Sequence, residues 1–96
     1  MELRVLRYFL AVAQEESVSR AAELLHVTQP TLSRQLMDLE DELGTRLFLR
    51  GGRRMTLTEE GMFLRKRAQE IVSLADRTSA EFRNSSEDIS GDVHIG

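Results

Sequence analysis

The sequence of 96 residues contains no cysteine, no tryptophan and a single proline, and its apolar runs extend over only a few residues. Without cysteine, the chain has no disulfide, no thiolate metal ligand and no cysteine nucleophile. The apolar runs are far shorter than the roughly 20 residues of a membrane-spanning helix, and charges interrupt the apolar pattern of residues 1–14, unlike in a signal peptide. We therefore expect a soluble, cytoplasmic protein with no membrane partner, built as one small domain with an extension.

The net charge of −3 argues at first against a nucleic-acid partner. Its distribution is uneven, because residues 1–57 hold eight arginines and eight acids, whereas residues 58–96 hold five basic and eight acidic residues. Residues 43–54 carry no acid and four arginines, which are Arg46, Arg50, Arg53 and Arg54. Screening limits the field of a charge to about 8 Å in physiological salt, so a local basic patch can bind phosphate on a near-neutral domain.

Three short helices are predicted before residue 45. The first spans Leu3–Glu15, and the second runs from an N-cap at Ser17 through Leu25. The third begins after an N-cap at Thr28, holds Pro30 in its first turn and ends at Gly44 in a left-handed cap. Apolar residues at helical spacing predict the buried positions, which are Leu6, Phe9, Leu10, Ala13, Ala21, Ala22, Leu24, Leu25, Leu32, Leu36, Leu39 and Leu43.

A basic hairpin is predicted after the third helix. Thr45–Leu49 and Arg54–Leu57 have strand character, and Gly51-Gly52 between them suits a tight turn with positive φ. Arg50 and Arg53 flank the turn and are expected to face each other across the hairpin.

A long fourth helix is predicted from a cap at Thr58 to about Asn84, because no proline interrupts this stretch and Glu59 and Glu60 favour a helix start. It spans roughly 40 Å at 1.5 Å per residue. Apolar and small residues repeat at steps of four and three, as in a heptad seam, at Leu64, Ala68, Ile71, Ala75, Thr78 and Phe82. We predict that this seam pairs with another molecule; the alternative is packing on the domain's own core.

The second and third helices form a helix-turn-helix pattern, in which the second helix of the pair places its amino-terminal residues at base edges in the major groove. The exposed residues at this position are Gln29, Pro30, Thr31, Ser33 and Arg34. Glutamine pairs with adenine, arginine with guanine, serine and threonine with a base or phosphate, and apolar groups with the thymine methyl. A merely solvated polar face is the alternative, but it leaves the basic hairpin unexplained.

The remaining polar residues are assigned around this interface. Arg50, Arg53 and Arg54 are predicted to enter a narrow minor groove, the alternative being a solvated loop. Ser17 and Thr28 are helix caps that can also contact phosphate. His26 is predicted to close the second helix as a structural residue, and Arg46 either pairs with nearby acids or contacts phosphate. No cluster with metal or catalytic spacing is present, so we expect no cofactor and no enzyme.

The chain resembles the LysR-type transcriptional regulators over residues 1 to about 88. The similarity rests on the order and spacing of Ala21-Ala22, Gln29-Pro30, Ser33-Arg34, Leu39-Glu40, Leu43-Gly44, Leu47-Phe48 and Leu57-Thr58 to Gly61. It implies DNA binding as a dimer, or as a tetramer in a full-length form, through the recognition-helix residues and a wing position that matches Arg53. The family often has glycine and an aromatic residue near the first turn, where this chain has Glu16 and Val18.

The predicted fold is mainly α: a winged helix-turn-helix of three helices and a two-stranded β wing in residues 1–57, followed by a linker and dimerisation helix in residues 58–86. The resemblance implies that residues 87–96 are a hinge and the start of an effector-binding domain, through which alone a small molecule would act. The expected function is regulation of transcription by a homodimer on a near-palindromic operator in double-stranded DNA. The rivals are a protein-interaction module, a minimal enzyme and a molybdate-responsive winged-helix regulator.

Overall fold

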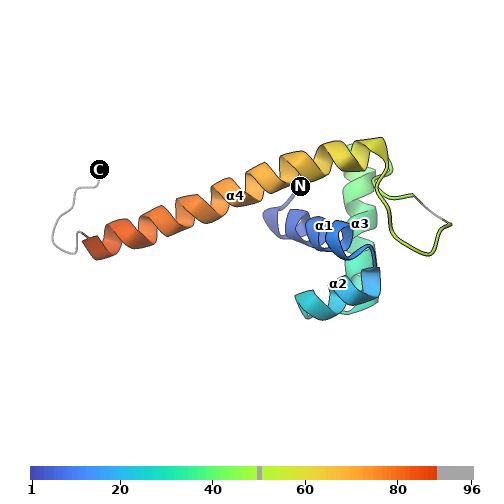
Figure 1. Cartoon of the computed structure of the whole chain (residues 1–96), viewed down its shortest axis with the longest axis horizontal. Helices are drawn as coiled ribbons and strands as arrows, with labels where there is room; N and C mark the ends of the chain where they lie inside the picture. Colours follow the sequence, from blue (N-terminus) through green and yellow to red (C-terminus); the bar gives the residue numbers. More distant parts are fainter. Residues whose placement is uncertain (50, 89–96) are drawn as a thin grey trace.

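Four helices make up the computed structural model, which describes residues 1–49 and 51–88, with the side chains of residues 85–88 left out. In chain order they are α1 (Leu3–Glu15), α2 (Val18–Leu25), α3 (Gln29–Leu43) and α4 (Glu59–Asp88). The first three form a bundle, and α4 crosses it and extends far beyond it (Figure 1). The described part of the chain is therefore mainly α, and the helices begin and end close to the predicted positions. Residues 87 and 88, predicted to begin the hinge of residues 87–96, belong to α4, and the rest of the predicted hinge and strand, residues 89–96, lies outside the described residues.

The three predicted N-caps are confirmed by side-chain hydrogen bonds. Ser17 Oγ accepts from the backbone N–H of Arg20 at 3.2 Å, and Thr28 Oγ1 accepts from that of Thr31 at 3.3 Å. Thr58 Oγ1 accepts from the N–H of Gly61 at 2.9 Å. Each bond satisfies one of the amide groups that a helix leaves unpaired at its first turn.

Left-handed residues end the first three helices. Gly44 has φ +71°, as predicted, and is well suited to this conformation. Glu16 and His26 have φ +55° and +60°, although neither is glycine. A non-glycine residue in this region carries a cost of roughly 1–2 kcal/mol. This cost therefore applies at the ends of both α1 and α2. Because His26 is the residue that ends α2, the structural role predicted for it is confirmed.

A single core joins α1 to the other three helices. Its centre contains Phe9 and Phe48, whose ring centroids are 5.4 Å apart with planes tilted by 55°, a favourable aromatic arrangement. The core therefore links α1 directly to the segment that leads into the wing. Its buried members are Val5, Leu6, Phe9, Val12, Ala21, Ala22, Leu32, Leu36, Leu39, Leu47, Phe48, Leu64 and Ala68.

Two predicted core positions are wrong. Leu24 is 61% exposed and Leu43 is 40% exposed. Around α2 the packed residues Val18, Ala21, Ala22 and Leu25 fall within about 100° of one another, and Leu24 lies outside this arc. Leu43 lies on the predicted face of α3, but in its final turn, at the edge of the core.

The predicted two-stranded wing is reduced to one antiparallel bridge between Phe48 and Leu57. Beside it, the N–H of Leu49 donates to the carbonyl of Thr56 at 2.8 Å. Most other described donors near the wing base bond outside the hairpin: the amides of Leu47 and Phe48 donate to Glu40, and that of Met55 donates to the carbonyl of Glu16. Consequently the described residues form no strand, and the wing is a loop held at its base.

Candidate nucleic-acid interface

The amino-terminal end of α3 presents polar side chains to solvent. Gln29, Pro30, Thr31 and Arg34 are exposed and Ser33 is half-buried, while Leu32 and Leu36 on the other side are buried. This end of α3 lies beside α2 and away from α4 (Figure 1). The structure thus brings the five predicted base-contacting residues together at one exposed helix end.

The hydroxyl groups at this end are ordered by one another. Thr28 Oγ1 donates to Thr31 Oγ1 at 2.9 Å while it accepts the capping amide of Thr31. Because the single hydroxyl proton of Thr28 is donated to Thr31, the proton left over from this bond is that of the Thr31 hydroxyl. Ser17 Oγ similarly lies 3.3 Å from Ser19 Oγ as well as capping α2. Both predicted phosphate-contact residues are therefore first of all caps.

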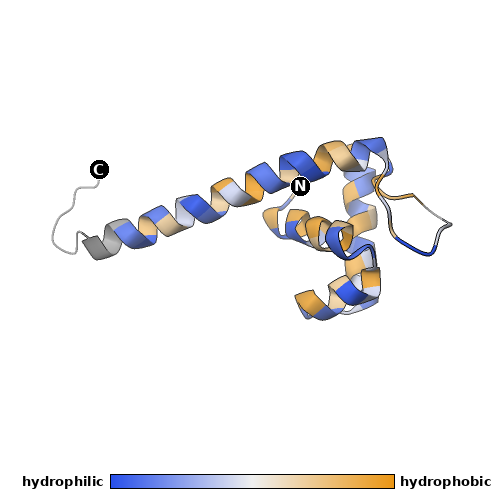
Figure 2. Ribbon diagram, viewed as in Figure 1, coloured by the Kyte–Doolittle hydropathy of each residue, from blue (hydrophilic) through white to orange (hydrophobic). Residues whose placement is uncertain are grey.

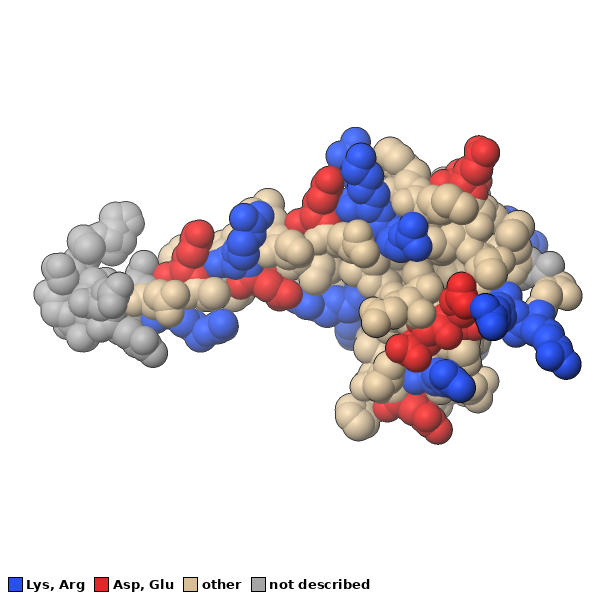
Figure 3. Space-filling model, in the orientation of Figure 1, with Lys and Arg blue, Asp and Glu red and all other residues tan. Residues whose placement is uncertain are grey.

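Arginines of the wing project at the end of the molecule opposite to the free end of α4 (Figure 1). Arg53 and Arg54 are both exposed, and Figure 3 shows basic side chains standing out at the wing beside acidic ones at its base. Arg54 Nη1 lies 3.2 Å from Glu16 Oε1. Within the described part of the chain, neither Arg53 nor Arg34 forms an ion pair. Arg50, also predicted for this site, lies outside the described residues.

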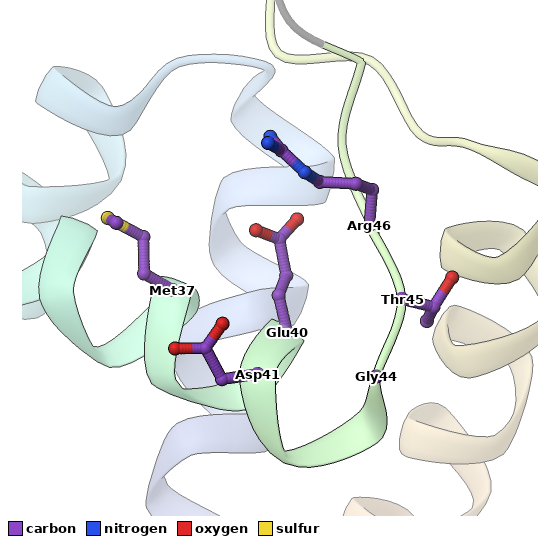
Figure 4. A pocket seen from close by; sticks show the side chains of 6 residues that line it. All are labelled: Met37, Glu40, Asp41, Gly44, Thr45 and Arg46. Carbon is purple, nitrogen blue, oxygen red and sulfur yellow. The ribbon is translucent and has the colours of Figure 1, made fainter.

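The buried acid Glu40, for which the sequence predicted no role, holds the entrance to the wing. Glu40 is only 7% exposed, and its Oε2 accepts from the N–H groups of Leu47 at 2.7 Å and Phe48 at 3.3 Å. Glu40 rises from α3 toward the segment that carries Arg46, and with Asp41 these residues line an open depression (Figure 4). The sequence could have indicated that Glu40 is buried, because this acid lies four residues after Leu36 on an apolar helix face.

The exit of the wing is held by the start of α4. The Thr58 hydroxyl donates to the carbonyl of Arg46 at 2.7 Å, and the Thr58 N–H donates to the carbonyl of Leu47 at 3.0 Å. Gly61 is buried here, and a Cβ atom at this position would overlap the Leu47 carbonyl and lie 2.9 Å from Leu57 Cδ2. A glycine is therefore required where α4 approaches the wing base.

The predicted dimerisation seam divides into two parts. Leu64 and Ala68 are 7% and 0% exposed because they pack in the chain's own core. For these two residues the predicted pairing with another molecule is wrong, and the alternative, packing on the domain's own core, is correct. Ile71, Thr78 and Phe82 are exposed and Ala75 is half-buried. Apolar residues alternate with polar ones along this outer part of α4 (Figure 2). An ion pair of 2.8 Å between Arg7 Nη2 and Asp76 Oδ1 ties α1 to α4 beyond the core.

The described residues contain no group of acidic or histidine side chains placed to hold a metal ion. Among the same residues, no helix is long and apolar enough to cross a membrane. The candidate functional surfaces are therefore the exposed end of α3, the basic wing and the outer part of α4.

Residues 3–62 match the family model described as "Bacterial regulatory helix-turn-helix protein, lysR family". The match covers more than half of the sequence, so the chain belongs to this family of transcriptional regulators, which are not enzymes. This decides against the molybdate-responsive alternative and the minimal enzyme.

Curated relatives agree with this assignment. The chain is 45% identical over 97 residues to the HTH-type transcriptional regulator BsdA of Bacillus subtilis (strain 168), covering 100% of this chain and 33% of that protein. It is 48% identical over 77 residues to the regulator BenM of Acinetobacter baylyi (strain ATCC 33305 / BD413 / ADP1), covering 80% of this chain and 25% of BenM. The chain thus spans about a third of the length of BsdA and about a quarter of BenM.

Solved structures identify the part of the regulator to which the chain corresponds. The BenM DNA-binding domain, solved in complex with benA site 1 DNA, superposes with a TM-score of 0.88 at 42% identity, covering 96% of this chain and 100% of that one. The CbnR DNA-binding domain in its DNA complex gives a TM-score of 0.83 at 40% identity, covering 90% and 99%. The chain is therefore the DNA-binding domain, with its linker helix, of a LysR-type transcriptional regulator.

Proposed function

We propose that the chain regulates transcription by binding a near-palindromic site in double-stranded DNA as a homodimer, with α3 in the major groove and the wing in the minor groove. The exposed polar end of α3 is the observation that carries this proposal, because it combines hydrogen-bonding side chains with an arginine that has no partner among the described residues. Two copies related by a two-fold axis would read half-sites about one helical turn apart, or a multiple of that distance.

Base recognition is assigned to the end of α3. Arg34 is suited to the O6 and N7 atoms of guanine and Gln29 to adenine, whereas Pro30 and the methyl group of Thr31 are suited to a thymine methyl. For Ser33, which is half-buried, we propose a contact to a base or a phosphate. The amide ends of α2 and α3 next to Ser17 and Thr28 are suited to phosphate, as helix N-termini commonly are.

For the minor groove we propose Arg53, together with Arg50. Arg53 is exposed on the wing loop, and both ends of that loop are fixed to the domain by Glu40 and Thr58. A narrow, A/T-rich minor groove has an enhanced negative potential that attracts arginine. Arg54 is left out of this contact because its guanidinium already pairs with Glu16.

Dimerisation is assigned to the outer part of α4. The exposed fractions of Ile71, Leu74 and Phe82 are 41%, 57% and 70%. With Thr78 they recur at steps of three and four, and the Thr78 hydroxyl is satisfied by the carbonyl of Leu74 at 2.7 Å. A helix of 30 residues with such a face gains stability by packing it against a second copy. Tetramer formation and any response to a small molecule are assigned to a carboxy-terminal effector domain of the full-length regulators.

Selection of bound sites from random DNA tests the proposal. We expect two inverted half-sites, and an affinity for the selected site about 10³-fold above that for a scrambled sequence at physiological salt. Affinity should also fall steeply as salt rises, because bound phosphates release counterions. Equal retention of the selected and scrambled sequences would refute sequence-specific binding, and a salt-independent affinity would favour the interaction-module alternative.

A further inference from the structure

The end of α1 is bonded to the wing through a single residue, Glu16. Its carbonyl accepts the N–H of Met55 at 3.1 Å, and its carboxylate Oε1 lies 3.2 Å from Arg54 Nη1. The residue that caps the end of the first helix therefore contacts two consecutive residues of the wing, through its backbone and through its side chain.

Glu16 is an unexpected residue for this place on two counts. It has φ +55°, a conformation that glycine adopts without cost but that a side chain opposes. It also carries a negative charge beside a loop proposed to approach the phosphates of DNA, which repel it. A residue that served only to end α1 would need neither the side chain nor the charge.

The two described arginines of the wing differ in their surroundings. Arg53 and Arg54 are neighbours in sequence and both are exposed, but among the described residues only Arg54 has an acidic partner. An arginine paired with a carboxylate brings no net charge to DNA, and transferring it to a phosphate requires breaking the existing pair. The two side chains are therefore not equivalent donors of positive charge.

We propose that Glu16 is a positioning residue of the wing that neutralises Arg54, so that Arg53 and not Arg54 supplies positive charge to the DNA from this side of the loop. The proposal rests on the proposed DNA binding and refines it. It predicts that the carboxylate of Glu16 lowers DNA affinity while its backbone carbonyl and its pair with Arg54 fix where the wing lies.

The salt dependence of DNA affinity measures this directly. Each phosphate neutralised by a protein cation contributes about −0.9 to the slope of log affinity against log salt on duplex DNA. Arg53→Ala should therefore reduce the steepness of the slope by about 0.9, and Arg54→Ala should leave it nearly unchanged. Equal reductions for the two variants would overturn the proposal.

Glu16→Gln tests the same idea from the other side, because it removes the charge and keeps the length of the side chain. It should free Arg54 and steepen the slope by about 0.9. Between 50 mM and 200 mM salt, the DNA affinity of Glu16→Gln should therefore fall by a factor roughly 3.5-fold larger than that of the unmodified protein. The double variant with Arg54→Ala should return to the slope of the unmodified protein. Glu15→Gln is the matched control, since it makes the same charge change one residue earlier and should have a smaller effect.

The outcomes separate this proposal from the proposed function. A steep slope for the unmodified protein supports DNA binding whatever the variants do. If that slope is steep but Glu16→Gln matches Glu15→Gln, only the role of Glu16 is overturned. A flat slope for the unmodified protein overturns both. Thermal unfolding of each variant shows that the domain stays folded, and a purely structural effect of Glu16 would change unfolding without changing the slope.

Discussion

Replacing Glu40 with alanine should destabilise the domain more than any exposed acidic substitution on the same helix. The Glu40 carboxylate accepts the amides of Leu47 and Phe48 at 2.7 and 3.3 Å, and it is 7% exposed. Alanine offers no acceptor, and Leu47 and Phe48 are each 1% exposed, so solvent does not readily replace it.

A buried amide left without an acceptor costs about 1–3 kcal/mol. For two amides the expected loss is about 2–6 kcal/mol, and we expect the lower half of this range because the 3.3 Å bond is the weaker one. This is a large fraction of the roughly 5–15 kcal/mol by which domains are stable. Glu40→Gln keeps an oxygen acceptor and loses the charge, so a smaller loss of about 1 kcal/mol is expected.

Urea unfolding followed by circular dichroism measures these differences, with Asp41→Ala as the control because Asp41 is the exposed neighbour of Glu40. The midpoint should fall in the order control, Glu40→Gln, Glu40→Ala at an unchanged slope. A Glu40→Ala variant as stable as the Asp41→Ala variant would show that the two amides do not depend on this carboxylate.

Four other predictions follow from the interface and from α4. Arg34→Ala should cost about 1–3 kcal/mol in binding and relax base preference at one position per half-site, whereas a uniform loss over all sequences would reduce Arg34 to a phosphate contact. Arg53→Ala should weaken binding most on A/T-rich flanks; independence of the flank sequence contradicts minor-groove insertion. Ile71→Asp should shift the protein toward monomer in sedimentation, and an unchanged dimer rejects this face. Arg7 hydrogen-bonds to Asp76 and lowers the pKa of that carboxyl below its ordinary value. The stabilisation from this contact should therefore be present above the unfolded pKa of aspartate and be lost as pH falls through the folded pKa. NMR titration should show the pKa of Asp76 rising in Arg7→Gln, and no change would contradict the pair.

The helices were predictable because local chemistry sets their ends. Ser17, Thr28 and Thr58 cap helices in the sequence and in the structure alike, and Gly44 adopts the expected left-handed conformation. The polar end of α3 was predictable for a related reason, since helical periodicity assigns Leu32 and Leu36 to the core and leaves its neighbours outside.

The wing was predicted less well because its backbone partners are distant in sequence. Glycines and alternating residues indicated a hairpin, but the amides near its base bond to Glu40 on α3 and to Glu16 at the end of α1. The heptad pattern of α4 failed for Leu64 and Ala68 because periodicity identifies an apolar face without identifying what covers it. For α4 the missing information was the position of α1, which packs against α2, α3 and α4, and for the wing it was the position of α3 as well.

The junction of α1 with α4 also determines the rotational phase of the proposed dimer. Burial of Leu64 and Ala68, together with the ion pair from Arg7 to Asp76, joins α4 to the rest of the domain in one fixed orientation. A residue inserted in α4 after Asp76 would therefore turn Thr78 and Phe82 by about 100° relative to Ile71, which stays in register with the recognition helix, and shift them by about 1.5 Å. A one-residue insertion should therefore divide the proposed dimer face, and a seven-residue insertion should bring its two parts back to nearly the same side of the helix at a longer spacing. In the proposed dimer, the number of residues in α4, and not only their identity, would thus set the separation of the half-sites.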